Sequence, residues 1–378
     1  MDSVSYRCPT CGTHYLLSDH PFRCDCGGYL NVDDSGMFGA QDLTGPPGSI
    51  WRYRKSFGLP ENVAPVSMGE GNTPILTLEI EGAKLHLKTD FQQPSGSFKD
   101  RGASVLVSAL KHTGVREVVE DSSGNAGAAL SAYAAAAGIG VTVYVPAYTQ
   151  EGKVVQIEMY GAKVVRVPGK RQDANIEALR AAQECVYASH LWNPYFIRGL
   201  SSVAYEIWEQ MGRSVPQAVI VPVGSGGFLE GLHHGFCTLK RAGFADSSPR
   251  LIGVQAAGCA PIHRAFVNDM EDSADIEVEK TIAEGIAVQK PPRARAVLAA
   301  LRNSGGYTVT VGEGEIIEAA KRLGRMGLFV EPTSASVLAA WLKIEKQDMK
   351  GALLVLTGSG LKAVATYHEL HGGIPSAK

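Results

Sequence analysis

Long apolar runs are missing from this chain of 378 residues. A membrane-spanning helix needs about 20 consecutive apolar residues, and because no stretch reaches that length we predict no membrane partner. A basic excess is missing as well. The formal net charge is −2 and the pI is near 6.6, so there is no electrostatic reason to expect a nucleic-acid partner. The opening residues, MDSVSYRCPTCG, lack the basic and apolar regions of a signal peptide, and we therefore expect a cytoplasmic location.

Two motifs of nucleotide-binding proteins are also missing. The sequence holds no Gly-x-x-x-x-Gly-Lys-Ser/Thr, which argues against an ATP-type phosphate loop, and no Gly-x-Gly-x-x-Gly follows the first predicted strand. Internal repeats and low-complexity tracts are not found. The composition, with 45% hydrophobic and 20% charged residues, is that of a soluble globular protein, and the length allows two or three domains.

Cysteine has an uneven distribution. Four of the seven cysteines lie within the first 26 residues, in the motifs Cys-Pro-Thr-Cys-Gly and Cys-Asp-Cys-Gly-Gly. In a reducing compartment such clusters are better metal ligands than disulfides, and four thiolates form a closed, structural zinc site. A ribbon without metal is the alternative, because the second motif is Cys-x-Cys. We predict an appended zinc-ribbon-like module at residues 1–34, structural or interacting, with the ligands Cys8, Cys11, Cys24 and Cys26.

The remaining cysteines, Cys185, Cys237 and Cys259, lie in apolar stretches and are most simply interpreted as buried thiols. Residues 35–50 are rich in glycine and proline and resemble a linker between the ribbon and the main body.

Beyond the linker, apolar strand-like runs alternate with helical patterns, which indicates an α/β fold. Several of the strands are apolar throughout, as expected when both faces of a parallel sheet are covered by helices. Strands are predicted at 116–120, 140–146, 162–168, 217–223, 250–256 and 351–358, and helices at 126–137, 150–160, 172–188, 199–211 and 227–241.

Three predicted strands end in glycine-rich turns, namely 121–127, 224–228 and 357–360. Such turns expose backbone amides at a helix N-terminus, where an anion binds, and ligands of open α/β sheets sit at this edge. A lone lysine in a Gly/Ser-rich loop is usually a solvated surface residue, and tight turns need glycine anyway. Lys99 in PSGSFKDRG, combined with three such turns, supplies what pyridoxal phosphate requires: an amine, a phosphate cradle and polar donors.

The sequence resembles the fold-type II pyridoxal-phosphate enzymes, and within them most closely the threonine synthase family. The resemblance covers essentially the whole chain, including the N-terminal ribbon. It rests on GEGNTP, PSGSFKDRG, SSGNAG, GSGGF, EPTSA and TGSGLK, in that order. It implies a two-domain fold like that of the tryptophan synthase β subunit and a homodimer. The large cofactor-binding domain is expected at 51–98 and 196–378, and the small domain at 99–195.

The resemblance also implies roles for single residues. Lys99 would form the Schiff base and shuttle protons, Asn125 would hydrogen-bond the cofactor 3-hydroxyl, and Thr357 would meet the pyridine nitrogen. From the residues alone, Asn125 could instead cap a helix beginning at 126, and Thr357 could be a strand-end residue. The cofactor would further contact Ser97, Gly224, Ser225, Gly226, Gly227 and Phe228, and the substrate would contact Ser122, Ser123, Gly124, Ala126 and Lys153.

Four further residues, in the lysine loop and before the helix that follows EPTSA, are expected to have structural roles. Phe98 is expected to anchor the lysine loop to the core, Asp100 and Arg101 to shape it, and Glu331 to stabilise the loop before its helix.

The implied reaction is that of a carbon–oxygen lyase acting on phosphate in amino-acid biosynthesis: O-phospho-L-homoserine and water give L-threonine and phosphate. The chain departs from the family pattern at two places. Ala126 replaces a threonine, and 190–196 (HLWNPYF) is bulkier and more aromatic than the usual segment. Lys153 and Arg198 are candidates for the missing positive charge, although each could be a solvated helix residue. The alternatives are a related β-replacement or elimination enzyme, like cysteate synthase or a serine/threonine dehydratase, and a non-catalytic interaction protein.

Overall fold

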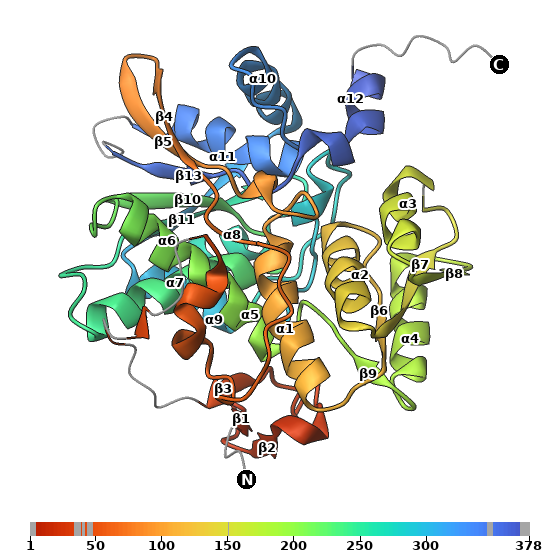
Figure 1. Ribbon diagram of the computed structural model, residues 1–378. Coiled ribbons are helices and arrows are strands. Elements are labelled where there is room, and N and C mark those ends of the chain that lie inside the picture. Colours follow the sequence, from red (N-terminus) through yellow and green to blue (C-terminus); the bar gives the residue numbers. More distant parts are fainter. Residues whose placement is uncertain are drawn as a thin grey trace. The chain divides into compact units, whose positions relative to one another are not determined.

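The computed structural model describes residues 5–33, 39, 42–43, 48–149, 151–345 and 351–370, so the linker predicted at 35–50 lies largely outside the described residues. The chain forms two compact units (Figure 1). The first comprises residues 1–72, 93–215 and 225–248, and the second comprises 73–92, 216–224 and 249–378. This grouping differs from the domains expected from the sequence, whose bounds stay predictions.

A four-stranded parallel sheet in the order β8-β7-β6-β9 lies in the first unit. Three of its strands coincide with predicted segments: β6 (Glu117–Glu120), β7 (Gly140–Pro146) and β8 (Lys163–Val167). The helix predicted at 172–188 is too long. Helix α4 (Arg171–Ala181) ends early, and the β-branched and aromatic residues of β9 (Val186–Tyr187) pair with β6.

Helices surround this sheet in Figure 1, and α2 and α4 pack directly against β7. The helix predicted at 199–211 appears as α6, and a further helix that was not predicted, α5, precedes it, begins with a proline at its first helical position and meets α6 at Ser201. The helices of this unit besides α4 are α1 (Lys99–His112), α2 (Asn125–Ala137), α3 (Glu151–Met159), α5 (Pro194–Leu200), α6 (Ser202–Gln210) and α7 (Gly227–Arg241).

The cysteine ribbon belongs to the first unit and packs against α5. Its antiparallel sheet has the order β2-β1-β3, formed by β1 (Ser5–Arg7), β2 (His14–Leu16) and β3 (Asn31–Asp33). The rings of Tyr6 and Tyr195 meet edge to face, with centroids 5.7 Å apart, and Arg198 donates to the carbonyl of Val32 at 3.1 Å. The ribbon thus forms a small sheet of its own, as expected for a ribbon-like module, and packs on the rest of the first unit through these contacts. Short 3₁₀ helices η1 (Leu17–Asp19) and η3 (Ile50–Phe57) complete the unit.

The second unit contains a six-stranded sheet in the order β12-β11-β10-β13-β5-β4. Every pairing is parallel except the β4–β5 hairpin. The predicted strands at 217–223, 250–256 and 351–358 appear as β10 (Ala218–Pro222), β11 (Arg250–Ala256) and β13 (Leu353–Val355). The strands that we did not predict are β4 (Ile75–Ile80), β5 (Ala83–Lys88) and β12 (Tyr307–Val311).

Helix α11 (Pro332–Lys343) packs against the central strands of this sheet and fills the core with Val337, Leu338 and Trp341. None of the helices in the described ranges is long and apolar enough to span a bilayer. The remaining elements are α8 (Pro261–Val267), α9 (Ala294–Asn303), α10 (Glu313–Arg325), α12 (Val364–Leu370), and the 3₁₀ helices η4 (Asp90–Gln92), η5 (Glu284–Ile286) and η7 (Gly360–Lys362).

A buried ion pair joins α1 to α6 in the first unit. The guanidinium of Arg101 donates to both carboxylate oxygens of Glu206 at 2.7 Å and to Ser202 Oγ at 3.1 Å. The side chains of Arg101 and Glu206 are 0% and 4% exposed. The carboxylate also accepts from the backbone amide of Asn72 at 2.8 Å. Because two charges have left water, each depends on the other for compensation.

We expect Glu206→Ala to lower the free energy of unfolding by about 3 kcal/mol or more, because it leaves the Arg101 charge buried without its partner. The midpoint of the thermal transition of this unit should fall by roughly 6–12 °C in calorimetry. Glu318→Ala on α10, which removes an exposed pair with Lys321, is the control and should leave the midpoint unchanged. Equal effects of the two substitutions would contradict the structural role of the Arg101–Glu206 pair.

Candidate active site

Lys99 is the first residue of α1 and lies over aromatic rings. Its Nζ is 4.9 Å from the ring centroid of Phe98 and 5.5 Å from that of Phe196. Phe196 reaches this place because α1 carries Gly102, where a Cβ atom would come within 2.7 Å of the ring. The amine is therefore held on an apolar floor, which is a setting suited to a nucleophilic lysine.

Phe98 connects the lysine loop to the glycine-rich turn before α7. Its ring lies 4.4 Å, centroid to centroid, from that of Phe228, which confirms the anchoring contact. Helix α7 begins at Gly227 and has Gly226 as its N-cap, so unpaired backbone amides face this turn. In the lysine loop, Ser97 Oγ is buried and has no hydrogen-bond partner among the described residues. A buried hydroxyl of this kind is available to a ligand, so the residues fit a phosphate-bearing cofactor.

The asparagine loop follows β6 and leads into α2. The helix begins at Asn125 with Gly124 as its N-cap, and no side chain makes the capping hydrogen bond. The alternative reading of Asn125 as the helix cap is therefore wrong. At Gly127 a Cβ atom would lie 1.9 Å from the carbonyl oxygen of Ser122, so only glycine allows the helix to lie this close to the loop. Of the predicted substrate-binding residues, Ser122, Ser123 and Gly124 lie in this turn, and Ala126 lies in the first turn of α2.

Two buried acids directly precede the loop, and the sequence analysis missed both. Glu120 Oε1 lies 2.7 Å from His190 Nδ1, and Asp121 accepts from Tyr187 at 2.8 Å and from Asn175 at 3.0 Å. Burial, reinforced by Asp121, raises the pKa of Glu120 well above its ordinary value, and burial lowers the pKa of His190. The signal in the sequence that could have indicated them is the position of two acidic residues directly after the apolar residues of a strand.

Thr357 lies in the second unit, two residues beyond β13, and is buried. Its hydroxyl is 3.0 Å from Ser334 Oγ. Ser334 also accepts from the backbone amides of Thr357 at 2.9 Å and Gly358 at 2.7 Å, so it fixes this turn. Ser334 belongs to the EPTSA motif and was not assigned a role from the sequence. Glu331 precedes α11, and its amide donates to the carbonyl of Gly358 at 3.0 Å, in agreement with a role in the loop. Gly224, the remaining predicted phosphate contact, is also in this unit.

The structure describes the side chain of only one of the two candidates for extra positive charge, Lys153 and Arg198. The side chain of Lys153 lies outside what the structure describes. Arg198 is not a solvated helix residue, because it contacts His234 Nε2 and the ribbon carbonyl of Val32.

Within the segment 190–196, His190 and Phe196 meet edge to face with ring centroids 5.9 Å apart. Asp100 accepts from the amide and hydroxyl of Ser95, which agrees with its predicted role in shaping the lysine loop.

The four N-terminal cysteines converge on one point. All four Sγ atoms lie within 4.8 Å of one another, and the closest pairs, Cys11–Cys24 and Cys8–Cys26, are 3.4 Å and 3.6 Å apart. Ligands of a tetrahedral zinc site with bonds of ~2.3 Å would be ~3.8 Å apart, so the thiols fit such an ion. Of the other three cysteines, Cys259 is buried as expected, whereas Cys185 and Cys237 are only half-buried.

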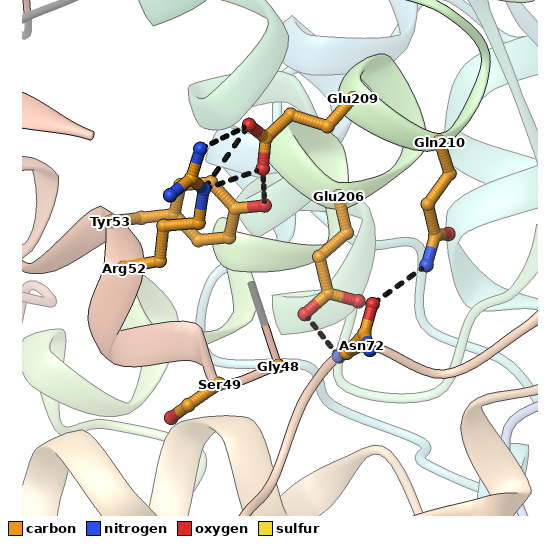
Figure 2. Close-up of a pocket in the computed structure, with 8 residues that line it drawn as sticks. All are labelled: Gly48, Ser49, Arg52, Tyr53, Asn72, Glu206, Glu209 and Gln210. Atoms are coloured by element: carbon orange, nitrogen blue, oxygen red, sulfur yellow. Dashed lines mark hydrogen bonds and ion pairs between the residues drawn. The ribbon is translucent and has the colours of Figure 1, made fainter. Parts of the chain in front are cut away.

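Figure 2 shows a polar pocket of about 240 Å³ in the first unit. Its charges are satisfied internally: Arg52 donates to both oxygens of Glu209, which also accepts from Tyr53 at 2.6 Å. Glu206 in its wall is the partner of Arg101. We assign this pocket a structural role, because it contains none of the predicted site residues.

Comparison with known proteins places these motifs in a family. The profile of the pyridoxal-phosphate dependent enzyme family matches residues 66–358. Among solved structures, a serine racemase from Dictyostelium discoideum superposes with a TM-score of 0.65 at 29% identity, covering 76% of this chain and 92% of its own. A threonine deaminase from T.th. gives a TM-score of 0.67 at 28% identity with the same coverage. The chain thus has the fold of the fold-type II enzymes.

Similarity to individual curated proteins indicates which group of this family the chain belongs to. The threonine synthase of Methanocaldococcus jannaschii is 34% identical over 373 residues, which span 94% of this chain and 92% of that protein. The threonine synthase of Methanosarcina acetivorans is 35% identical, with 94% and 91% coverage. These alignments span nearly all of both proteins. The chain therefore belongs to the threonine synthase family of pyridoxal-phosphate-dependent enzymes.

Proposed function

We propose that this protein is a threonine synthase, which converts O-phospho-L-homoserine and water into L-threonine and phosphate. The observation that carries the proposal is the setting of Lys99: an amine above two aromatic rings, in a loop whose buried Ser97 hydroxyl lacks a partner among the described residues. Full-length similarity to proteins named threonine synthase supports the substrate.

In this proposal the cofactor is held by residues of the three predicted turns. Lys99 would bind it covalently, Asn125 would contact its ring, and the amides at the start of α7 would hold its phosphate, with Ser97 and Phe228 as further contacts. Thr357, whose hydroxyl is 3.0 Å from Ser334 Oγ, would meet the ring nitrogen, and Gly224 would contribute to the phosphate cradle. When bound, pyridoxal phosphate supplies an electron sink for negative charge at Cα.

Three tasks then fall to the protein. Lys99 Nζ takes the proton from Cα of the substrate and returns one later, which is general acid–base catalysis by a positioned amine. The turn formed by Ser122, Ser123, Gly124 and Ala126 receives the substrate carboxylate through the amides before α2. Lys153, on α3, is proposed as a contact to the substrate phosphate.

A second candidate is a related enzyme that replaces or eliminates a β-substituent, as cysteate synthases and serine/threonine dehydratases do. Two observations favour it. Ala126 removes a hydroxyl from the substrate turn, and Arg198 is occupied by His234 and the ribbon. Both reduce the number of groups available to bind a substrate phosphate.

A substrate panel separates the two candidates. Phosphate release is measured with O-phosphohomoserine and with O-phosphoserine, the latter with and without sulfite, and keto-acid formation is measured with serine and threonine. A threonine synthase releases phosphate from O-phosphohomoserine and forms threonine in equal amount. Turnover of O-phosphoserine or serine without turnover of O-phosphohomoserine would replace the proposal with the second candidate.

Lys99→Ala is expected to abolish the visible absorbance of the cofactor-loaded protein and to lower kcat by about a thousandfold or more, because the same amine binds cofactor and moves the proton. Lys111→Ala, in the last turn of the same helix and exposed, is the matched control and should retain both. A colourless wild-type protein that cannot be reconstituted with pyridoxal phosphate would exclude the role of Lys99.

We also propose that the four N-terminal cysteines hold a structural zinc ion. The ribbon buries only a few apolar side chains of its own, so a metal is needed to order it. We also propose the cytoplasmic location expected from the sequence and the homodimer implied by the family resemblance, which sedimentation would detect.

Elemental analysis should find about one zinc per chain, the stoichiometry of a closed four-cysteine site. Cys24→Ser is expected to lose the metal and to lower the thermal midpoint, since the ribbon packs on Tyr195. Cys185→Ser, outside the cluster, serves as the control and should keep the full metal content. Unchanged zinc content in Cys24→Ser would rule out this site.

A further inference from the structure

The buried pair of Glu120 and His190 lies beside the lysine that binds the cofactor. Glu120 ends β6 and precedes the substrate turn, whereas His190 begins the segment 190–196, in which the chain departs from its family. The side chains are 1% and 11% exposed, and their hydrogen bond is 2.7 Å long. The second contact of His190 is the ring of Phe196, which forms the floor under Lys99 Nζ.

The contacts of Glu120 favour its neutral, protonated form. Its Oε2 is buried and has no hydrogen-bond partner among the described residues. Burying an ionised carboxylate with one oxygen that has no hydrogen bond carries a large free-energy cost. A carboxylic acid can donate through Oε1 to His190 Nδ1, and its other oxygen, a neutral carbonyl, then lacks a hydrogen bond at a lower cost. Burial first, and Asp121 second, raise the pKa of Glu120, in agreement with this assignment.

The charges around the pair come from three elements. Lys99 at the start of α1 and Arg171 at the start of α4 are close enough to lower the pKa values of both Glu120 and His190, and Asp121 follows β6. For His190, burial and both cations act in the same direction and keep the ring neutral. A neutral acid thus donates to a neutral imidazole, so Glu120 adds no negative charge to that of its buried neighbour Asp121.

We propose that Glu120 and His190 form a positioning pair for Lys99: His190 holds Glu120 as a neutral hydrogen-bond donor, so that its carboxyl group does not trap the lysine as an ammonium ion. A lysine must be a free amine to bind the cofactor and to take a proton from Cα. Phe196 is in contact with both Lys99 and His190, the partner of Glu120, and an ionised carboxylate in these surroundings would stabilise the ammonium form and raise the pH needed for reaction by about one unit or more. The inference rests on the role of Lys99 in the proposed function.

Stripped protein is mixed with pyridoxal phosphate between pH 6 and 9, and the rate and pH midpoint of the visible band are recorded without substrate. His190→Leu removes the group that accepts the hydrogen bond from Glu120. Glu120 should then lose its proton, and its carboxylate should stabilise the ammonium form of Lys99. The midpoint should rise by about one unit, and cofactor capture at pH 7 should slow about tenfold. His190→Asn, whose carbonyl can accept at the position of Nδ1, and Glu120→Gln, which is neutral, should behave like wild type.

The double variant Glu120→Gln/His190→Leu distinguishes this role from a merely structural one. Removal of the carboxyl should restore the midpoint to within a few tenths of a unit, although the double variant lacks more hydrogen bonds than either single variant. A double variant as impaired as His190→Leu, or no shift in His190→Leu, would overturn the proposal. If His190→Leu does not fold, His190→Ala replaces it. A wild-type protein that forms no band would refute the proposed role of Lys99 instead, so the two failures are distinguishable.

Discussion

The close crossing of α1 and α5 is the contact on which the functional part of the first unit depends. Gly102 on α1 admits the ring of Phe196, and Gly199 on α5 lies where a Cβ atom would meet the carbonyl of Arg101 at 2.2 Å. Side chains larger than hydrogen at either position would separate the helices. Their packing places an aromatic floor under Lys99 and buries Arg101, whose charge is then compensated by Glu206. The position of the reactive amine and the main electrostatic constraint of the unit therefore have a common origin.

The segment that includes α5 also explains why the ribbon belongs to this unit. Along one short stretch, Tyr187 donates a hydrogen bond to Asp121, which precedes α2, His190 pairs with Glu120, and the ring of Phe196 lies near Lys99 Nζ. The ribbon packs on the same stretch, through Phe22 against Tyr187 and Trp192 and Tyr6 against Tyr195. A small module with few apolar side chains gains stability from such contacts, and the segment gains a rigid support.

The sequence was sufficient to predict features that depend on local pattern. Six strands, the start of α7 and the loop around Lys99 follow from apolar runs and glycine-rich turns, which are short-range signals. The pairs missed were of another kind. Glu120 and His190 are separated by 70 positions, and Thr357 and Ser334 by 23, so no periodicity connects them. The end of α4 was misjudged because its apolar pattern continues into β9, where pairing with β6 overrides helical preference.

The substrate question can now be stated in physical terms. A dianionic phosphate group needs cations or several hydrogen-bond donors, and Ala126 at the start of α2 has no hydroxyl to donate. Arg198 cannot compensate while it holds Val32 and His234. The segment from Tyr187 to Arg198 thus contacts both the ribbon and the surroundings of Lys99. A substitution in this segment that alters the surroundings of Lys99 would therefore also act on the ribbon contacts, because the same backbone between Tyr187 and Arg198 carries both.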